Sequence, residues 1–301
     1  MDMRQLHYVT TISEYRSFTK AAKALHVAQP SLSAYIAKAE TELGVILFDR
    51  STSPLTLTYA GEQYIKNAKR ILEITTNMQK EFRDISENLK GKIHVGIPRD
   101  RAAFMMPAIM KEYNSIYPGI KIHIREDSTA NLLNFLYGGK IDIAIIPDTV
   151  TDSNVQKEDI YAEELLLVSN DNFIGEGHLI DGLKGHVDIS KIQDMPLITL
   201  RKGHGIRDAI EKLFASNGAK PNVIMETSSN ITAFRLASAG IGIAIVPEMT
   251  VKLVREVEDI SFYSITAIKA SWNIVSAYRK DSFVGIAEKT LLSVARRAFT
   301  Q

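Results

Sequence analysis

The sequence predicts an α/β protein with an α-rich N-terminal domain, built as a winged helix-turn-helix, a long linker helix and a two-lobed α/β domain. Three observations support this prediction: two short helical segments around a tight turn, a heptad pattern after them, and two later runs of alternating strands and helices. The expected bounds are 1–58 for the winged domain, 59–90 for the linker and 91–301 for the α/β domain, in which lobe I is 91–162 with 267–301 and lobe II is 163–266.

The helix-turn-helix is indicated by residues that start and stop helices near the N-terminus. Ser17 carries a hydroxyl that can cap an alanine-rich helix over 18–25. A second helix is expected over 29–43, with Pro30 in the first turn, where its missing N–H has no intrahelical partner, and Gly44 at its end. Two short helices with a tight turn between them are typical of this motif.

The next segment predicts a wing and then a long helix. Two β-like runs, 45–48 and 55–58, form the expected hairpin, and Thr58 is placed to cap a helix from Tyr59 to about Leu89. The apolar positions of this helix are spaced alternately by four and three residues, as in a coiled coil: Tyr64, Ala68, Ile71, Thr75, Met78, Phe82, Ile85 and Leu89. We therefore expect Ile71, Met78 and Phe82 to be buried between two chains; the alternative is a helix that packs only on its own domain.

After Gly91 the pattern changes to two βαβαβ units, which predict two mostly parallel sheets covered by helices. The expected strands are 92–97, 120–125 and 141–146 in the first unit, and 197–200, 222–227 and 241–246 in the second. The expected crossovers between the lobes are 163–169 and 260–267, followed by a strand over 270–278 and a terminal helix over 283–299.

Composition and motifs narrow the classes of function. The 301 residues include no cysteine, which excludes disulfides, thiolate metal sites and thiol redox sensing. The net charge of +1 does not by itself indicate a nucleic-acid partner. The chain has neither an apolar run of the roughly 20 residues that a membrane span needs nor the pattern of a secretory signal peptide, so we expect a cytoplasmic protein.

Enzymatic chemistry finds no support in the sequence. The seven histidines are scattered without paired ligand spacing, and the sequence contains no HExxH, GxSxG or GxxxxGK[ST] motif. We expect no catalytic residue, no metal and no cofactor.

Four motifs together resemble the LysR-type family of bacterial transcriptional regulators. They are the helix-turn-helix run over 17–33, the segment 42–50 that ends in Leu47-Phe48-Asp49-Arg50, the start of the linker helix over 57–61, and the glycine-containing strand over 239–247. The resemblance covers nearly the whole chain. It implies a winged domain that binds double-stranded DNA, linker helices paired antiparallel in a dimer, and periplasmic-binding-protein-like effector domains that assemble into a homotetramer, a dimer of dimers. RNA polymerase is a further candidate partner.

The resemblance also places the residues that contact DNA. The expected contacts are Gln29, Pro30, Ser31, Ser33, Tyr35 and Lys38 on the recognition helix, and Arg50 at the base of the wing. A glutamine can make a bidentate contact to adenine in the major groove, and the N–H groups at a helix N-terminus favour phosphate. Many family members have Arg or Gln at the position of Ala34, and a second wing arginine at the position of Ser53, so this chain departs from the family pattern there.

Effector contacts are expected beyond the carboxyl ends of the strands, where open α/β sheets bind ligands. The candidates are Arg99, Asp100, Ser128, Thr129, Arg201, His204, Ser228 and Ser229. Basic side chains beside helix N-termini indicate a small anion, a carboxylate or a phosphate. The alternative is a set of solvated charges, with Arg99 paired to Asp100 or Asp127.

Two other classes of protein share part of this pattern. A solute-binding protein would account for residues 91–301 but not for the first 90, and it would need a signal peptide. An enzyme on the same two-lobed fold would need a nucleophile and a base, and the sequence indicates neither.

Overall fold

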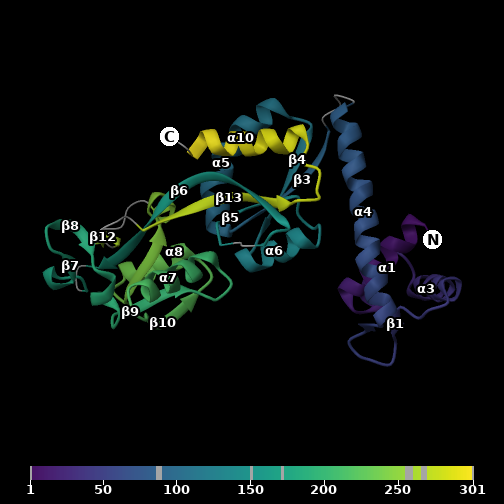
Figure 1. Ribbon diagram of the computed structural model, residues 1–301, viewed down its shortest axis with the longest axis horizontal. Helices are drawn as coiled ribbons and strands as arrows, with labels where there is room; N and C mark the ends of the chain where they lie inside the picture. Colours follow the sequence, from purple (N-terminus) through teal and green to yellow (C-terminus); the bar gives the residue numbers. More distant parts are fainter. Residues whose placement is uncertain are drawn as a thin grey trace. The chain divides into compact units, whose positions relative to one another are not determined.

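The computed structural model describes residues 2–85, 90–149, 152–170, 173–254, 260–265 and 270–299. The chain forms two compact units, Met1–Ile85 and Ser86–Gln301 (Figure 1). No helix in the described ranges is both long enough and apolar enough to cross a membrane.

The first unit is a small helical domain with a two-stranded wing. Its elements are α1 (Met3–Tyr15), α2 (Phe18–Ala24), α3 (Gln29–Leu43), β1 (Phe48–Asp49), β2 (Thr56–Leu57) and α4 (Tyr59–Ile85). Ser17 caps α2 by accepting a hydrogen bond from the backbone N–H of Lys20, and Gly44 ends α3 in the left-handed conformation, with φ +69°. The predicted helix-turn-helix is confirmed.

The wing is shorter than the sequence predicts. Its strands pair only Phe48 with Leu57 and Asp49 with Thr56. The reason is that the preceding backbone groups bond to side chains: Glu40 accepts from the N–H groups of Leu47 and Phe48, and Thr58 donates to the carbonyl of Ile46. These backbone groups are therefore not available for a longer ladder.

The second unit is built from two lobes around a shared set of strands. Its elements are β3 (Gly91–Ile97), α5 (Arg99–Ile116), β4 (Ile120–Glu126), α6 (Thr129–Tyr137), β5 (Ile143–Pro147), β6 (Val155–Asn170), η1 (Glu176–His178), β7 (Leu179–Ile180), β8 (Leu183–Val187), η2 (Ile189–Ile192), β9 (Pro196–Leu200), α7 (Gly205–Ser216), β10 (Asn222–Thr227), α8 (Asn230–Ser238), β11 (Ile243–Pro247), α9 (Glu248–Leu253), β12 (Ile260–Ile265), β13 (Ser271–Arg279) and α10 (Ile286–Phe299).

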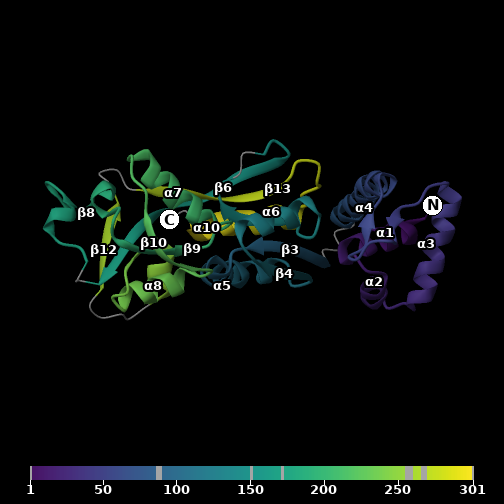
Figure 2. The same cartoon turned by 90° about the horizontal axis from the view of Figure 1, so that it is seen from below.

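The strands follow the order β10-β9-β11-β6-β13-β5-β3-β4. Three parallel strands form the centre of each lobe: β4, β3 and β5 in one, and β10, β9 and β11 in the other. The antiparallel strands β6 and β13 join the two groups. In lobe I, α5 and α10 cover one face of the sheet and α6 covers the other (Figure 1). In lobe II, α7 and α8 lie on opposite sides of the strands (Figure 2).

The structure corrects one expectation about this unit and adds features that the sequence analysis did not predict. The strand expected only over 163–169 is β6, which begins at Val155 and pairs with β13 along its first half and with β11 and β12 along its second. Helix α5 begins at Arg99, directly after β3, which places Asp100 in its first turn, where a carboxylate is favoured. Strands β7 and β8 were not predicted from the sequence, because they lie in a segment with several glycines. Residues 266 and 267 of the second expected crossover, 260–267, lie outside the described residues.

Candidate functional site

The recognition helix α3 presents most of the predicted DNA contacts to solvent. Gln29, Pro30, Ser31 and Lys38 are exposed, and Lys38 forms only a long ion pair with Glu42, 3.9 Å away in the next turn. This end of α3 therefore offers side chains and helix N–H groups that a DNA duplex can reach.

Tyr35 lies differently from the other candidates. Its hydroxyl donates to the carboxylate of Asp2 at 3.0 Å, and its ring meets Tyr8 edge-on at 5.2 Å. Burial and the bond to Asp2 together raise the pKa of Tyr35. These contacts hold Tyr35 against α1, so its hydroxyl already has a partner within the domain.

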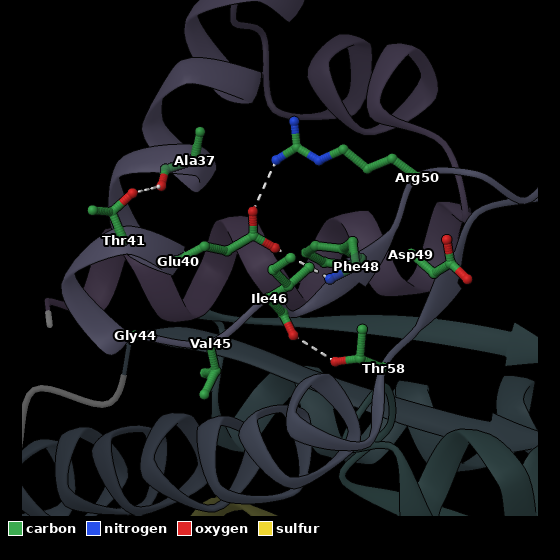
Figure 3. A pocket seen from close by; sticks show the side chains of 10 residues that line it. All are labelled: Ala37, Glu40, Thr41, Gly44, Val45, Ile46, Phe48, Asp49, Arg50 and Thr58. Atoms are coloured by element: carbon green, nitrogen blue, oxygen red, sulfur yellow. Dashed lines mark hydrogen bonds and ion pairs between the residues drawn. The ribbon is translucent and has the colours of Figure 1, made fainter.

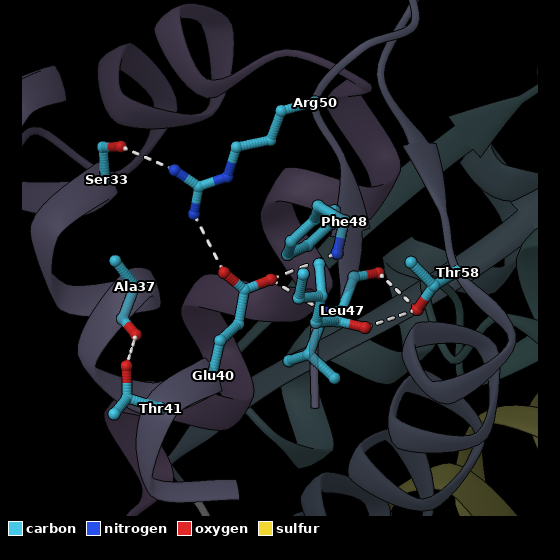
Figure 4. Close-up of polar contacts among 9 residues, drawn as sticks. Ser33, Ala37, Glu40, Thr41, Leu47, Phe48, Arg50 and Thr58 are labelled. Carbon is cyan, nitrogen blue, oxygen red and sulfur yellow. Dashed lines mark hydrogen bonds and ion pairs between the residues drawn. The ribbon is translucent and has the colours of Figure 1, made fainter. Parts of the chain in front are cut away.

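Arg50 is held against the recognition helix (Figure 4). One guanidinium nitrogen, Nη2, donates to Oε2 of Glu40 at 2.9 Å, and Nη1 lies 3.5 Å from Oγ of Ser33. The guanidinium also lies over the ring of Phe18, 5.1 Å from its centroid. The Arg50 side chain remains 44% exposed, so its other N–H groups stay accessible to a phosphate.

Glu40 links three elements of the domain. Its Oε1 accepts from the backbone N–H groups of Leu47 at 2.7 Å and Phe48 at 3.2 Å, while Oε2 holds Arg50. The side chain is only 10% exposed. Glu40 was not among the predicted site residues, because its partners follow it by seven to ten positions and no local pattern marks them.

A cavity of about 760 Å³ lies beside this ion pair, between α3, the base of the wing and the start of α4 (Figure 3). Thr58 closes one side, since its hydroxyl donates to the Ile46 carbonyl at 2.6 Å and accepts from the Gly61 N–H at 3.0 Å. Val45 and Ile46 leave apolar surface exposed at its edge. The contacts of Glu40 and Thr58 thus fix the segment 46–48 to both α3 and α4.

The heptad positions on α4 fall into two groups. Tyr64 packs against the core of the first unit and Ala68 is buried, so the early positions serve the chain's own domain. Met78 is 48% exposed and Phe82 is 61% exposed, while Ile71 is half-buried. The side chain of Ile85 and all of Leu89 lie outside the described residues. The later positions are therefore the ones that leave apolar surface without cover within the described part of the chain.

The second unit has a polar cavity of about 350 Å³ between its lobes. The lining comes from the carboxyl ends of β3, β4, β9 and β10 and from the helices that follow them: Pro98, Arg99, Asp100, Glu126, Asp127, Ser128, Asn131, Leu200, Arg201, Lys202, His204, Ser228 and Asn230. Six of the eight predicted effector contacts are in this set, and the exceptions are Thr129 and Ser229. The other lining residues were not among the eight candidates: Pro98, Glu126, Asp127, Asn131, Leu200, Lys202 and Asn230.

Thr129 and Ser229 join the lobes to each other. The Thr129 hydroxyl accepts from the N–H of Gly205 at 3.2 Å. The Ser229 hydroxyl donates to the carboxylate of Asp100 at 3.2 Å, and the N–H of Asn230 donates to the same carboxylate at 2.5 Å. Asp100 therefore places its negative charge at the N-terminus of α8, so its carboxylate is engaged across the cleft between the lobes.

The charges around the cavity are mixed. Arg99 lies 3.7 Å from Glu126, so the alternative that paired it with Asp100 or Asp127 named the wrong partner. Burial raises the pKa of Asp127, but hydrogen bonds from Asn131 and Ser128 outweigh it and leave this pKa below its ordinary value. Burial lowers the pKa of His204 more than the nearby carboxylates raise it, which keeps the imidazole neutral at pH 7.

Behind this cavity a buried ion pair joins the lobes. Arg101 and Glu163 lie 2.5 Å apart and are almost inaccessible. Trp272 donates its Nε1–H to Glu163 at 3.1 Å, and the N–H of Met249 donates to the other oxygen at 3.3 Å. These residues come from α5, β6, β13 and α9, so the pair lies where the strands shared by the lobes meet helices of both.

Comparison with known proteins accounts for both units. The family model of the bacterial regulatory helix-turn-helix protein of the lysR family matches residues 3–62, and that of the LysR substrate binding domain matches residues 86–300. The chain belongs to the LysR family of transcriptional regulators. The enzyme and solute-binding alternatives are therefore excluded, and the predicted family and fold class are confirmed.

Relatives of this LysR-type regulator match along most of their length. The HTH-type transcriptional regulator BsdA of Bacillus subtilis (strain 168) is 33% identical over 250 residues, which cover 82% of this chain and 84% of that protein. The uncharacterized regulator YcgK of the same organism is 28% identical and covers 100% of this chain and 96% of its own length.

Solved structures show the same fold. The Corynebacterium glutamicum OxyR C206 mutant is 26% identical with a TM-score of 0.63, over 99% of this chain and 92% of that one. Full-length CbnR, solved in complex with its target DNA, is 22% identical with a TM-score of 0.64, over 99% of this chain and 100% of that one. The regulator is thus a DNA-binding protein with an effector-binding domain.

Proposed function

We propose that this regulator responds to a small molecule with an anionic group, a carboxylate or a phosphate, that binds in the cavity between the two lobes. The observation that carries the proposal is the pair Arg201 and Lys202, whose side chains line the cavity and have no ion-pair or hydrogen-bond partner among the residues that the structure describes. Two unpaired cations in a recess beside helix N-termini favour an anion. Ser128, which caps α6, and Arg99 and His204 complete the proposed contacts.

Calorimetric titration of carboxylates and phosphates into the full-length protein tests this proposal. We expect the wild type to bind at least one anion and the Arg201→Gln variant to bind it at least about tenfold more weakly, because a charge-assisted contact is lost. Ser128→Ala serves as a second variant at the end of α6. Tight binding of neutral compounds alone, or anion binding that is indifferent to both variants, would refute the proposal.

We further propose that DNA is contacted by six residues: Gln29, Pro30, Ser31, Ser33, Lys38 and Arg50. Tyr35 is proposed as a further contact, made from the side of α3 that packs against α1. The exposure of the start of α3 and the accessible guanidinium of Arg50 support this assignment. Gln29 and the serines would read bases, and Arg50 would contact the backbone or the minor groove. Retardation of a DNA fragment from the protein's own promoter region, with wild type and variants, tests the assignment.

We also propose that the later heptad positions of α4, including Ile71, Met78 and Phe82, pair with a second copy of the chain, and that two dimers assemble into a tetramer. The exposed apolar surface at Met78 and Phe82 supports the pairing. We propose the same domain bounds as above, with the winged domain over 1–58, the linker over 59–90 and the effector domain over 91–301. RNA polymerase is proposed as a further partner. Light scattering of the full-length protein measures the assembly.

The lobes are proposed to transmit effector binding by a change in their relative angle. The continuous strand β6, which belongs to both lobes, is one connection about which such a change can occur. A ligand shifts this equilibrium only by its differential affinity for the two arrangements, and DNA must then change effector affinity by the same factor. Titrations with and without promoter DNA measure that factor.

A further inference from the structure

The lining of the cavity between the lobes carries as many negative as positive side chains. Arg99, Arg201 and Lys202 are cationic, and Asp100, Glu126 and Asp127 are anionic. His204 adds no charge at neutral pH, since burial lowers its pKa. A ligand that is only an anion therefore meets carboxylates as well as cations, and a ligand with groups of both signs fits this lining better.

The positively and negatively charged side chains that can bind a ligand lie on different elements of the fold. Arg201 and Lys202 follow β9 in lobe II and have no side-chain partner in the described ranges. Asp127 follows β4 in lobe I and uses one carboxylate oxygen, Oδ1, to accept from the Ser128 N–H and the Asn131 amide. The other oxygen, Oδ2, accepts no hydrogen bond from a described residue. The carboxylate of Asp100, by contrast, already accepts hydrogen bonds from Ser229 and Asn230 at the N-terminus of α8.

A buried amide beside these groups lacks a donor. Asn230 lines the cavity, is only 8% exposed, and has a buried Oδ1 with no hydrogen-bond partner in the described part of the chain. Buried acceptors in native proteins are almost always paired, so an orphan in a binding cavity calls for an explanation. An ionised carboxylate cannot satisfy it, because such a group only accepts hydrogen bonds.

We propose that the effector is a small zwitterion of the amino-acid class, with its carboxylate at Arg201 and Lys202 and its ammonium group donating to Asp127 and Asn230. This inference rests on the proposed function, because it narrows the anion of that proposal to one that also carries a cationic donor. The ammonium group has three N–H donors, enough to donate both to Oδ2 of Asp127 and to Oδ1 of Asn230. The cavity of about 350 Å³ is near the lower end of small-molecule sites, which suits a molecule of this size.

The test uses matched sets of ligands on the full-length protein. Each of the common L-amino acids is titrated by calorimetry beside its desamino acid, which keeps the carboxylate, and its decarboxylated amine, which keeps the ammonium group. We expect at least one amino acid to bind, with its desamino acid and its amine at least about tenfold weaker. Inorganic phosphate and simple dicarboxylates complete the series.

Variants assign the two ends of the ligand. Asn230→Leu and Asp127→Asn should each weaken the amino acid by about tenfold while leaving the desamino acid unchanged, whereas Arg201→Gln should weaken both. The backbone N–H of Asn230 still meets Asp100 in Asn230→Leu, and the amide oxygen in Asp127→Asn can still accept from Ser128 and Asn131. Either variant alone decides the question if the other does not fold.

The outcomes separate this inference from the proposed function. If desamino acids or phosphate bind as tightly as any amino acid, the zwitterion is refuted and the anionic effector stands. If amines bind without a carboxylate, or no compound of the series binds, both are refuted. Equal losses for amino and desamino acids in Asn230→Leu and Asp127→Asn would also overturn the assignment of the ammonium group.

Discussion

Replacing Glu40 with alanine and with glutamine should separate its two roles in the DNA-binding unit. In Glu40→Ala the N–H groups of Leu47 and Phe48 lose their acceptor, and both residues are at most 1% exposed. An unsatisfied buried donor costs about 1–3 kcal/mol, so with two such donors we expect the variant to lose about 2–6 kcal/mol of unfolding free energy. Glu40→Gln keeps an oxygen for both N–H groups and loses only the charged contact to the half-exposed Arg50, which costs about 1 kcal/mol or less.

Scanning calorimetry with circular dichroism at helical wavelengths is the suitable assay. For a unit of this size, 1 kcal/mol lowers the melting temperature by roughly 4–8 °C, so the alanine variant should melt at least about 8 °C lower. The single tryptophan, Trp272, lies in the other unit, and its fluorescence transition should not move. Arg50→Ala is the matched control, because Glu40→Gln should have little further effect in that background. Equal losses for the alanine and glutamine variants would refute the role assigned to the two backbone bonds.

Three further predictions concern DNA, assembly and pH. Gln29→Ala should reduce discrimination at one base pair per half-site by about 1–3 kcal/mol, measured by competition footprinting, whereas Arg50→Ala should weaken all sequences alike and flatten the salt dependence; an unchanged Gln29→Ala footprint would contradict the assignment of α3. Met78→Glu with Phe82→Glu should lower the mass in light scattering and leave the fold intact, since both side chains are exposed within one chain; an unchanged mass would contradict the pairing. Because burial lowers the pKa of His204, anion affinity should be constant from pH 8 to 6.5 and rise only at lower pH, and stability linked to this group should fall over the same acidic range; a His204→Gln variant with the same pH profile would exclude this residue.

The helix-turn-helix could be predicted from the sequence because its signals are local. Ser17 and Gly44 mark helix ends through contacts within a few residues, and the structure places both as expected. The role of Glu40 could not be predicted in this way. Its partners Leu47 and Arg50 lie close to it because the chain turns back after α3, and no periodic pattern in the sequence predicts that turn.

The candidate effector site was predicted in part, for a similar reason. Polar residues at the carboxyl ends of strands converge in any sheet of parallel strands, which is why Ser128 and Arg201 both line the cavity. Whether such a residue faces a ligand or the opposite lobe depends on contacts between distant parts of the chain. Asp100 and Ser229 were both taken as effector contacts, yet they bond to each other across the cleft.

The pairing of Asp100 with α8 also restricts where an effector can place its charge. A helix N-terminus is an attractive site for an anion, but this one already holds a carboxylate of the chain itself. An acidic group that enters the cavity would meet repulsion there. Among the described residues, the lining cations whose side chains have no partner are Arg201 and Lys202, on the loop before α7. The contacts of Asp100 with Ser229 and Asn230 also join the two lobes. An effector therefore changes the regulator only through contacts that differ between the arrangements of the lobes. The groups that can supply such contacts are the side chains of Arg201 and Lys202, Oδ2 of Asp127 and Oδ1 of Asn230, which have no hydrogen-bond partner among the described residues.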